Sequence, residues 1–320
     1  MVSIGRILVM NHAVTHSVMF HHFHDEIHPP AQGSLSESNF REMLSWLGKN
    51  YSLIGANDYK NKFESGILSN ADICLSFDDA LKCQYDVAVP VLEEFGLDAF
   101  FFVYSSAFTD NPDYLEIYRY FRTSSFDNID EFYSDFFVIV EQLDREAFTN
   151  HKSLYKKMDY LLEFPFYSEN DKWFRYLRDQ YLGSVRYHEV MNKMMSVHGF
   201  VVDDEKKNLW MSESELRTIH QNGHTVGLHS YSHPTQMSKL SRLEQEIEYN
   251  KNYEHLSKVT GNLIKVMSHP CGDYNQDTLD ILNSMGIVMG FRSSMSITDI
   301  NSSLEIPRED HANVFKEMNQ

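Results

Sequence analysis

Short apolar runs alternate along the chain with longer segments whose apolar residues recur at helical spacing. The short runs predict strands at 6–11, 71–77, 97–104, 224–229, 263–269, 287–291 and 303–308. The longer amphipathic segments predict helices at 36–50, 84–95, 212–223, 241–261 and 276–286. Strands that are repeatedly followed by helices are typical of a parallel sheet with its helices outside, so the predicted fold class is α/β.

Capping residues support these helix boundaries. Ser36 stands where a helix N-cap is expected, directly before a segment whose apolar side includes Phe40 and Leu44. Ser212 and Glu215 have the spacing of a capping box, and Gly223 is placed to end the same helix.

The number of strand–helix units, about seven, favours a closed or nearly closed barrel over an open sheet. In parallel barrels the chemistry gathers at the carboxyl ends of the strands. Polar clusters fall at such ends in this sequence, namely Asn11–His12, Asp78–Asp79, His229, Ser268–His269 and Arg308. This coincidence predicts a single site at one end of the barrel.

Between about residues 108 and 206 the character of the sequence changes. Aromatic and charged residues mix there without strand-like alternation, which predicts a helical insertion within a single domain spanning 1–320. Large apolar side chains at helical spacing usually bury, so we expect a core or a subunit interface that makes a homo-oligomer. A lid over the site is the alternative. The aromatic residues concerned are Tyr118, Tyr120, Phe121, Trp173, Phe174 and Tyr176.

Composition and charge narrow the choice of partners. With 42% hydrophobic residues among 320, the chain can bury a sizeable core. The net charge of -18 repels phosphate backbones and anionic membrane surfaces, which argues against a nucleic-acid partner. No apolar run near the start is long enough for a signal peptide or a membrane span, so we expect a cytoplasmic protein.

Cysteine and histidine usage adds two observations. The three cysteines have no metal-like spacing and indicate a reducing compartment rather than a disulfide framework. Six histidines gather between His12 and His28, and we interpret this segment as a solvated loop at the rim of a pocket.

Two histidines four positions apart, His229 and His233, lie in the segment GLHSYSHP. The glycine before them and the proline after them favour a loop at a strand end over a helix. Together with the acidic pair at another strand end, they offer one carboxylate and two imidazoles, the ligand set of a hydrolytic zinc site. Capping of a following helix is the alternative explanation of Asp78 and Asp79.

Different roles would explain why the two aspartates are adjacent. One ligates the metal, and the other takes a proton from a water whose pKa the metal lowers to about 7. The cation also keeps both carboxylates ionised where they would otherwise repel each other.

The segments LSFDDA, HSYSHP and SHPCGDYN, in this order, resemble the three leading motifs of the polysaccharide deacetylases, carbohydrate esterase family 4. The resemblance covers residues 6–104 and 210–310 and leaves the insertion out. It implies a distorted (β/α)7 barrel that hydrolyses an acetyl group from a sugar.

Carried over position by position, the resemblance also implies roles for single residues. Asp78 is expected to be the general base. The expected metal ligands are Asp79, His229 and His233. Pro270 and Cys271 lie in one turn, and the backbone N–H of Cys271 is expected to help stabilise the oxyanion.

The third motif departs from the family pattern. Ser268 stands where the family usually has an arginine, and Cys271 stands where it usually has an aromatic residue. We expect Arg308, at the end of the last strand, to replace the arginine that orients the base. As general acid we prefer His12, because it ends a strand, and His311 is the alternative.

These observations predict a metal-dependent hydrolase that removes an acetyl group from an N-acetylated sugar, with Zn²⁺ as the expected cation. Without an export signal, the expected substrate is a soluble or precursor sugar, such as a nucleotide-linked one. Arginines of the insertion would then form a basic patch for its phosphates, namely Arg119, Arg122, Arg175 and Arg178. Two alternatives remain: hydrolysis of a non-sugar linear or cyclic amide, and a catalytically degenerate barrel that binds a glycan.

Overall fold

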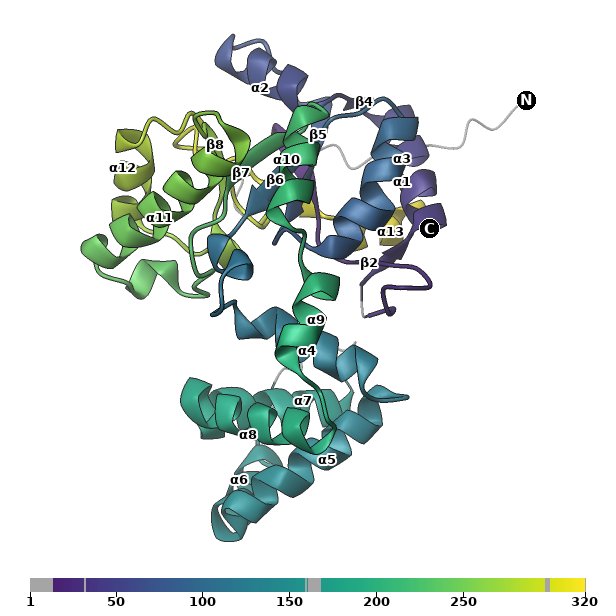
Figure 1. The fold of residues 1–320 in the computed structure, drawn as a ribbon, viewed down its shortest axis with the longest axis vertical. Helices are drawn as coiled ribbons and strands as arrows, with labels where there is room; N and C mark the ends of the chain where they lie inside the picture. The colour runs from purple at the N-terminus through teal and green to yellow at the C-terminus, as the bar shows by residue number, and fades with distance from the viewer. Residues whose placement is uncertain (1–13, 32, 159, 161–167, 297–299, 320) are drawn as a thin grey trace. The chain divides into compact units, whose positions relative to one another are not determined.

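The computed structural model describes residues 14–31, 33–158, 160, 168–296 and 300–319. The chain divides into two compact units, which are described one at a time (Figure 1). The barrel unit comprises residues 1–113 and 207–320, and the helical unit comprises residues 114–206. The assignment of the whole chain to one domain stays a prediction.

The barrel unit is built on parallel strands. Seven strands form a continuous path, with a short strand, β4 (Ser52–Leu53), paired to β5 outside it. Their order is β10 (Arg308–Asp310), β1 (His16–Phe20), β5 (Asp72–Asp78), β6 (Phe100–Val103), β7 (Thr225–Leu228), β8 (Val266–Ser268) and β9 (Met289–Phe291).

The two ends of this path nearly meet. Phe291 in β9 forms a parallel bridge with Ile306, which lies two residues before β10. Arg292 N–H donates to the Ile306 carbonyl at 2.8 Å, and Ser17 N–H in β1 donates to the Pro307 carbonyl at 3.2 Å. Residues 306–310 therefore join β9 to β1, and the predicted distorted (β/α)7 barrel is confirmed.

Helices surround the strands in the predicted alternation. They are α1 (Glu37–Asn50), α2 (Ala56–Glu64), α3 (Val89–Glu94), α10 (Glu213–Gln221), α11 (Arg242–Thr260), α12 (Gln276–Ser284) and α13 (His311–Met318). A π-helical turn, Gln84–Ala88, precedes α3, and short 3₁₀ turns occupy Ser105–Phe108, Met237–Lys239 and Pro270–Gly272. A small separate sheet pairs β2 (Phe23–His24) with β3 (Leu35–Ser36). The predicted caps are present: Ser36 accepts from Asn39 N–H, and Ser212 and Glu215 form a capping box.

The barrel interior is aromatic. Phe100, Phe102 and Phe291 are fully buried and pack together, with the rings of Phe100 and Phe102 stacked 5.8 Å apart and the ring of Phe291 tilted against both. Because the strands of the path are covered on both faces, their residues are buried almost throughout rather than at alternate positions, and β6 is a continuous apolar run.

Two expectations about the strands need correction. The histidine-rich segment is not a solvated loop throughout, because His16–Phe20 forms β1, buried at all five positions between β10 and β5. The sequence pattern does not indicate this strand because its first two residues, His16 and Ser17, are polar. In the structure both are buried together with the apolar residues of the strand. The last strand begins at Arg308 rather than ending there. The predicted strand at 6–11 lies outside the described residues.

The helical unit contains α4 (Tyr114–Ser124), α5 (Ile129–Leu143), α6 (Arg145–Tyr155), α7 (Glu169–Tyr176) and α8 (Gly183–Val197), with a π-helical turn at Leu177–Leu182. A further helix, α9 (Val202–Leu209), crosses the boundary between the two units in the sequence. Phe132, Phe136 and Phe174 are fully buried and pack edge-to-face or stacked within this unit. Its aromatic residues thus build a core of its own, as expected. None of the described helices combines the length and the apolar composition needed to cross a lipid bilayer.

Replacing Gly227 by alanine should destabilise the protein. A Cβ atom at this position in β7 would lie 2.6 Å from the Phe102 ring and 2.9 Å from the Val266 side chain. We expect Gly227→Ala to lower the free energy of unfolding by about 1–3 kcal/mol, the usual effect of overpacking a core. Gly48→Ala in α1 is the matched control, since its Cβ meets nothing within 4 Å, and it should stabilise by about 0.5–1 kcal/mol. Urea denaturation measures both, and equal stabilities would contradict the packing argument.

Candidate active site

The two aspartates stand at the carboxyl end of β5. All seven residues of this strand are buried, and the strand ends at Asp78. Asp79 N–H donates to the Phe102 carbonyl of β6 at 3.0 Å, which fixes the first residue after the strand. The backbone then turns sharply, with a φ of 79° at Asp79 and 54° at Ala80. The turn lets two consecutive carboxylates contact different partners.

The two histidines come from the loop after β7. His229 N–H donates to the Asn252 side chain at 3.0 Å, and Asn252 in turn donates to the Val103 carbonyl at 2.9 Å. Glu248 accepts from the backbone N–H groups of residues 231 and 232 at 3.0 and 2.8 Å. Both anchoring residues lie on α11, so this helix shapes the loop that returns the chain to His233.

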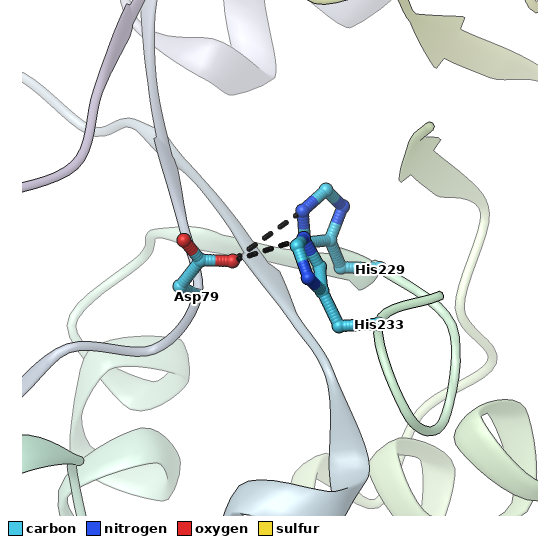
Figure 2. Close-up of side chains that lie close together, drawn as sticks. All are labelled: Asp79, His229 and His233. Atoms are coloured by element: carbon cyan, nitrogen blue, oxygen red, sulfur yellow. Dashed lines mark ion pairs between the residues drawn. The ribbon is translucent and has the colours of Figure 1, made fainter. Parts of the chain in front are cut away.

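Asp79, His229 and His233 converge on one point. Asp79 Oδ1 lies 3.5 Å from His229 Nε2 and 3.6 Å from His233 Nε2. The three ligand atoms all lie within 4.8 Å of one another. Figure 2 shows the carboxylate facing both imidazoles, with the two ion pairs drawn as dashed lines.

The outer nitrogens of both histidines face acceptors. His229 Nδ1 lies 2.9 Å from the Ser268 carbonyl, so it carries a proton and donates it. His233 Nδ1 lies 3.4 Å from a carboxylate oxygen of Asp113. These contacts favour Nδ1 as the protonated atom and point Nε2 of each ring at the cluster, as metal-bound histidines require.

The electrostatics of the cluster suit a cation. Burial lowers the pKa of His229 to about 3, although Asp78 opposes the shift. Burial also disfavours charge on His233, but Asp79 and Asp113 outweigh it and raise its pKa to about 9. The negative charge of Asp79 and Asp113 therefore exceeds the positive charge of the one histidine, His233, that they keep protonated. One carboxylate with two imidazoles fits a divalent metal, and zinc takes this set readily.

Asp78 is held by a buried arginine. Arg308 makes a two-pronged contact with its carboxylate, Nη1 to Oδ1 at 2.7 Å and Nη2 to Oδ2 at 2.6 Å. The same guanidinium donates to Ser268 Oγ at 2.7 Å. Burial would raise the pKa of Asp78, but Arg308 and His229 outweigh it and hold the pKa well below its usual range. The expected contact between Arg308 and the predicted base is thus present, and the small Ser268 leaves room for it.

His21, directly after β1, lies beside Asp78, with Nε2 3.8 Å from Oδ2. Burial lowers its pKa to about 4, opposed by Asp78. The two predicted general acids are placed differently. His12 lies outside the described residues. His311 stacks on Phe20 and donates from Nε2 to the Gly33 carbonyl at 2.7 Å, so this nitrogen is occupied.

The turn at Pro270–Gly272 follows β8 at the same end of the barrel. Cys271 is exposed and has a φ of 53°. Among the described residues no acceptor pairs with its backbone N–H, so this group remains available to a ligand. Pro270 is buried and begins the turn.

Backbone strain is concentrated around the site. Within the described part of the chain, five residues other than glycine have a positive φ, and all five lie in these three loops: Asp79, Ala80, Ser230, His233 and Cys271. Such conformations cost about 1–3 kcal/mol each and persist where the surroundings enforce them, typically at functional sites.

Four contacts of the site were not foreseen from the sequence: those of His21, Asp113, Glu248 and Asn252. His21 lay in the histidine-rich segment that was interpreted as a loop. Asp113 belongs to no motif, and nothing local marks it. For Asn252 a signal existed, because the buried side of α11 carries Gln245, Tyr249 and Asn252 at helical spacing. Fully buried amides on a helix usually hold another segment in place.

Comparison with known proteins agrees with this geometry. A family model described as polysaccharide deacetylase matches residues 189–290, which include both histidines of the cluster and Cys271 but neither aspartate. None of the curated proteins matches the sequence.

Three solved structures share the fold over nearly the whole chain. The deacetylase PplD of Streptococcus pyogenes, in complex with acetate, has a TM-score of 0.55 and 14% identity, covering 92% of this chain and 91% of its own. For IcaB from Ammonifex degensii the values are 0.56 and 12%, with coverage of 95% and 94%. For a de-N-acetylase from Aggregatibacter actinomycetemcomitans they are 0.53 and 13%, with coverage of 92% and 93%.

Identities this low show a common fold and no more. The family match spans two of the three motifs, HSYSHP and SHPCGDYN, but not LSFDDA. The chain therefore has the barrel fold of these deacetylase structures and resembles the polysaccharide deacetylases over residues 189–290.

Removing Arg308 should destabilise the fold strongly, because it leaves the buried Asp78 carboxylate uncompensated. We expect Arg308→Leu to lower the free energy of unfolding by about 3–5 kcal/mol. The double variant Asp78→Leu/Arg308→Leu should recover part of this loss, because neither charge then remains buried.

The exposed pair of Arg242 and Asp277, 3.0 Å apart, provides the control. Arg242→Leu should change the free energy of unfolding by no more than about 1 kcal/mol. Denaturant titration measures all three variants. A double variant no more stable than Arg308→Leu would refute the importance of the charge pair.

Proposed function

We propose that the protein is a metal-dependent deacetylase that hydrolyses the N-acetyl group of an amino sugar. The observation that carries this proposal is the convergence of Asp79, His229 and His233, with the outer nitrogen of each histidine beside an acceptor. These three residues would hold the cation. When bound, a divalent cation such as Zn²⁺ supplies Lewis acidity, which lowers the pKa of water and polarises a carbonyl.

Other residues of the chain transfer the protons and stabilise the charge that develops during hydrolysis. Asp78 accepts the proton of the attacking water, and Arg308 keeps this carboxylate ionised and oriented. The backbone N–H of Cys271 donates to the carbonyl oxygen as negative charge develops on it. The proton that Asp78 takes from the water passes to neutral His21, whose Nε2 lies 3.8 Å from Asp78 Oδ2. The imidazolium that results is a strong acid, because burial lowers its pKa, and it donates this proton to the departing amine.

The charge pairing of the helical unit favours a nucleotide-linked substrate less than the sequence does. Three of the four arginines of the helical unit are paired with acidic neighbours, Arg119 with Glu116, Arg175 with Asp171 and Arg178 with Asp179. They therefore offer less charge to a diphosphate than expected. A non-sugar amide remains the second candidate, favoured by the small Ser268 and Cys271 side chains of the third motif. The cytoplasmic location and the homo-oligomer stay predictions.

Acetate release from N-acetylhexosamine substrates tests the proposal. We expect release to stop on addition of a chelator and to fall by about 10²–10⁴-fold in Asp78→Asn, the usual contribution of a general base. His229→Ala should lose both activity and bound metal, measured by elemental analysis of the purified protein.

His198→Ala, in the helical unit, is the control and should retain both metal and activity, since this histidine pairs with Asp135 of the same unit and is not one of the predicted ligands. A small-amide panel assayed in parallel separates the sugar substrate from the second candidate. Undiminished acetate release by Asp78→Asn would overturn the role of the base, and unchanged metal content in His229→Ala would overturn the metal site.

The proton donor can be tested with two leaving groups. We expect His21→Gln to lower kcat on an N-acetyl sugar by about 10²–10⁴-fold while the metal content stays unchanged. The loss should shrink on 4-nitrophenyl acetate, because 4-nitrophenolate leaves without needing a proton. His311→Gln, whose ring bonds the Gly33 carbonyl, should show no such dependence on the leaving group. A larger and leaving-group-dependent loss in His311→Gln would transfer the role to that residue.

A further inference from the structure

A cavity of about 320 Å³ lies at the opposite end of the barrel from the aspartates and histidines described above. β7 and β8 begin at its wall with Thr225 and Val266, whereas their carboxyl ends carry His229 and Ser268. Segments from α2, α10 and the loop that follows α11 complete the lining. Its volume is at the lower end of the range for small-molecule sites, about 300–1,000 Å³. We call it the amino-end cavity.

The charge of the amino-end cavity is opposite to that of the whole protein. The chain has a net charge of -18, yet none of the described residues that line this cavity is acidic. Two lysines line it, Lys60 and Lys265, and neither forms an ion pair within the described part of the chain. Lys265 Nζ donates to the Gly286 carbonyl at 3.2 Å, which holds the ammonium group without neutralising it. Two uncompensated cations at one cavity favour an anionic ligand.

One histidine adds a neutral donor to the same wall. His224 is 3% exposed, and its Nδ1 accepts from Ala99 N–H at 3.1 Å, so the ring proton is on Nε2. Burial lowers the pKa of His224, which keeps this ring neutral. The side-chain amide of Asn262, another residue of the lining, donates to His220 Nε2 at 2.7 Å and so holds these two lining residues together.

The two carboxylates that act on His224 both have other partners. Asp98 Oδ2 accepts from the Asn57 backbone N–H and side-chain amide at 2.8 and 2.9 Å, and Glu93 accepts from the Asn222 amide at 3.2 Å. The two Asn57 donors lie in the first turn of α2, so Asp98 caps that helix.

We propose that the amino-end cavity binds the phosphate group of a small phosphomonoester. Lysine ammonium groups bind phosphate as point charges, and a phosphate presents three strong acceptor oxygens that match several separate donors. Lys60 and Lys265 supply charge, while His224 supplies an N–H donor. The cavity shares no residue with the cluster of Asp79, His229 and His233, so the proposal stands independently of the deacetylase activity.

Calorimetric titration of the metal-loaded protein tests the proposal, with glucose 6-phosphate, inorganic phosphate and succinate as probes. We expect both phosphates to bind and succinate to bind at least about tenfold more weakly, because a carboxylate lacks the third oxygen. Lys60→Gln and Lys265→Gln should each weaken phosphate binding about tenfold, the loss expected for one charge-assisted hydrogen bond. Lys316→Gln on α13, an exposed lysine outside the cavity, is the control of equal charge change.

The double variant Lys60→Gln/Lys265→Gln separates this cavity from any other phosphate site. Loss of binding in the double variant, with wild-type affinity in Lys316→Gln, supports the proposal. Binding of wild-type strength in the double variant places the phosphate elsewhere and overturns it. So does a wild-type protein that binds neither phosphate at millimolar concentration, or one that binds succinate equally well. The urea denaturation midpoint of the double variant should equal that of the wild type, which shows that the variant folds.

Discussion

The arrangement of the barrel's carboxyl end depends on one buried guanidinium. Arg308 is fully buried and contacts Asp78 and Ser76 of β5, Ser268 of β8 and the carbonyl of Arg292 directly after β9. Since it begins β10, a single side chain joins four separate strands across the interior. Taking such a charge out of water is costly, and only its full set of partners offsets the cost. The Asp78 carboxylate and the closure of the barrel are therefore stabilised by the same group.

Around this pair, the loops that carry the cluster are held in conformations that they would not adopt alone. Asp79 and His233 both have a positive φ, and the opposing restraints come from backbone contacts with β6 and from the amide and carboxylate of α11. Rigid elements thus hold the side chains of Asp79, His229 and His233 close together. The proposed site for a small, strongly coordinating ion needs such preorganisation.

The sequence predicts the parts of this protein that depend on local pattern. Continuous apolar runs identified β5 and β6, and a capping box identified α10, because strand burial and helix capping involve neighbouring residues. Asp79, His229 and His233 could be predicted as ligands because each belongs to a short motif at a strand end. β1 was missed because burial of His16 and Ser17 is decided by the strands on either side, not by their own polarity.

Contacts between residues that are far apart in the sequence cannot be predicted from local pattern alone. Asp78 and Arg308 are 230 positions apart, and their pairing was expected only from resemblance and strand position. Asp113 faces His233 without any motif of its own, so only the fold brings the two together. The same holds for Asn252 and the backbone of His229. These contacts are consequences of the barrel closing rather than of any stretch of sequence.

Asp113 is also the last residue before the helical unit begins at Tyr114. A related protein could replace, shorten or lose the helical unit and still keep this carboxylate only if the change begins after Asp113. A splice placed one residue earlier would take away the group that faces the outer nitrogen of His233. The boundary between the two units is therefore also a limit on how the protein can be recombined, by evolution or by an engineer.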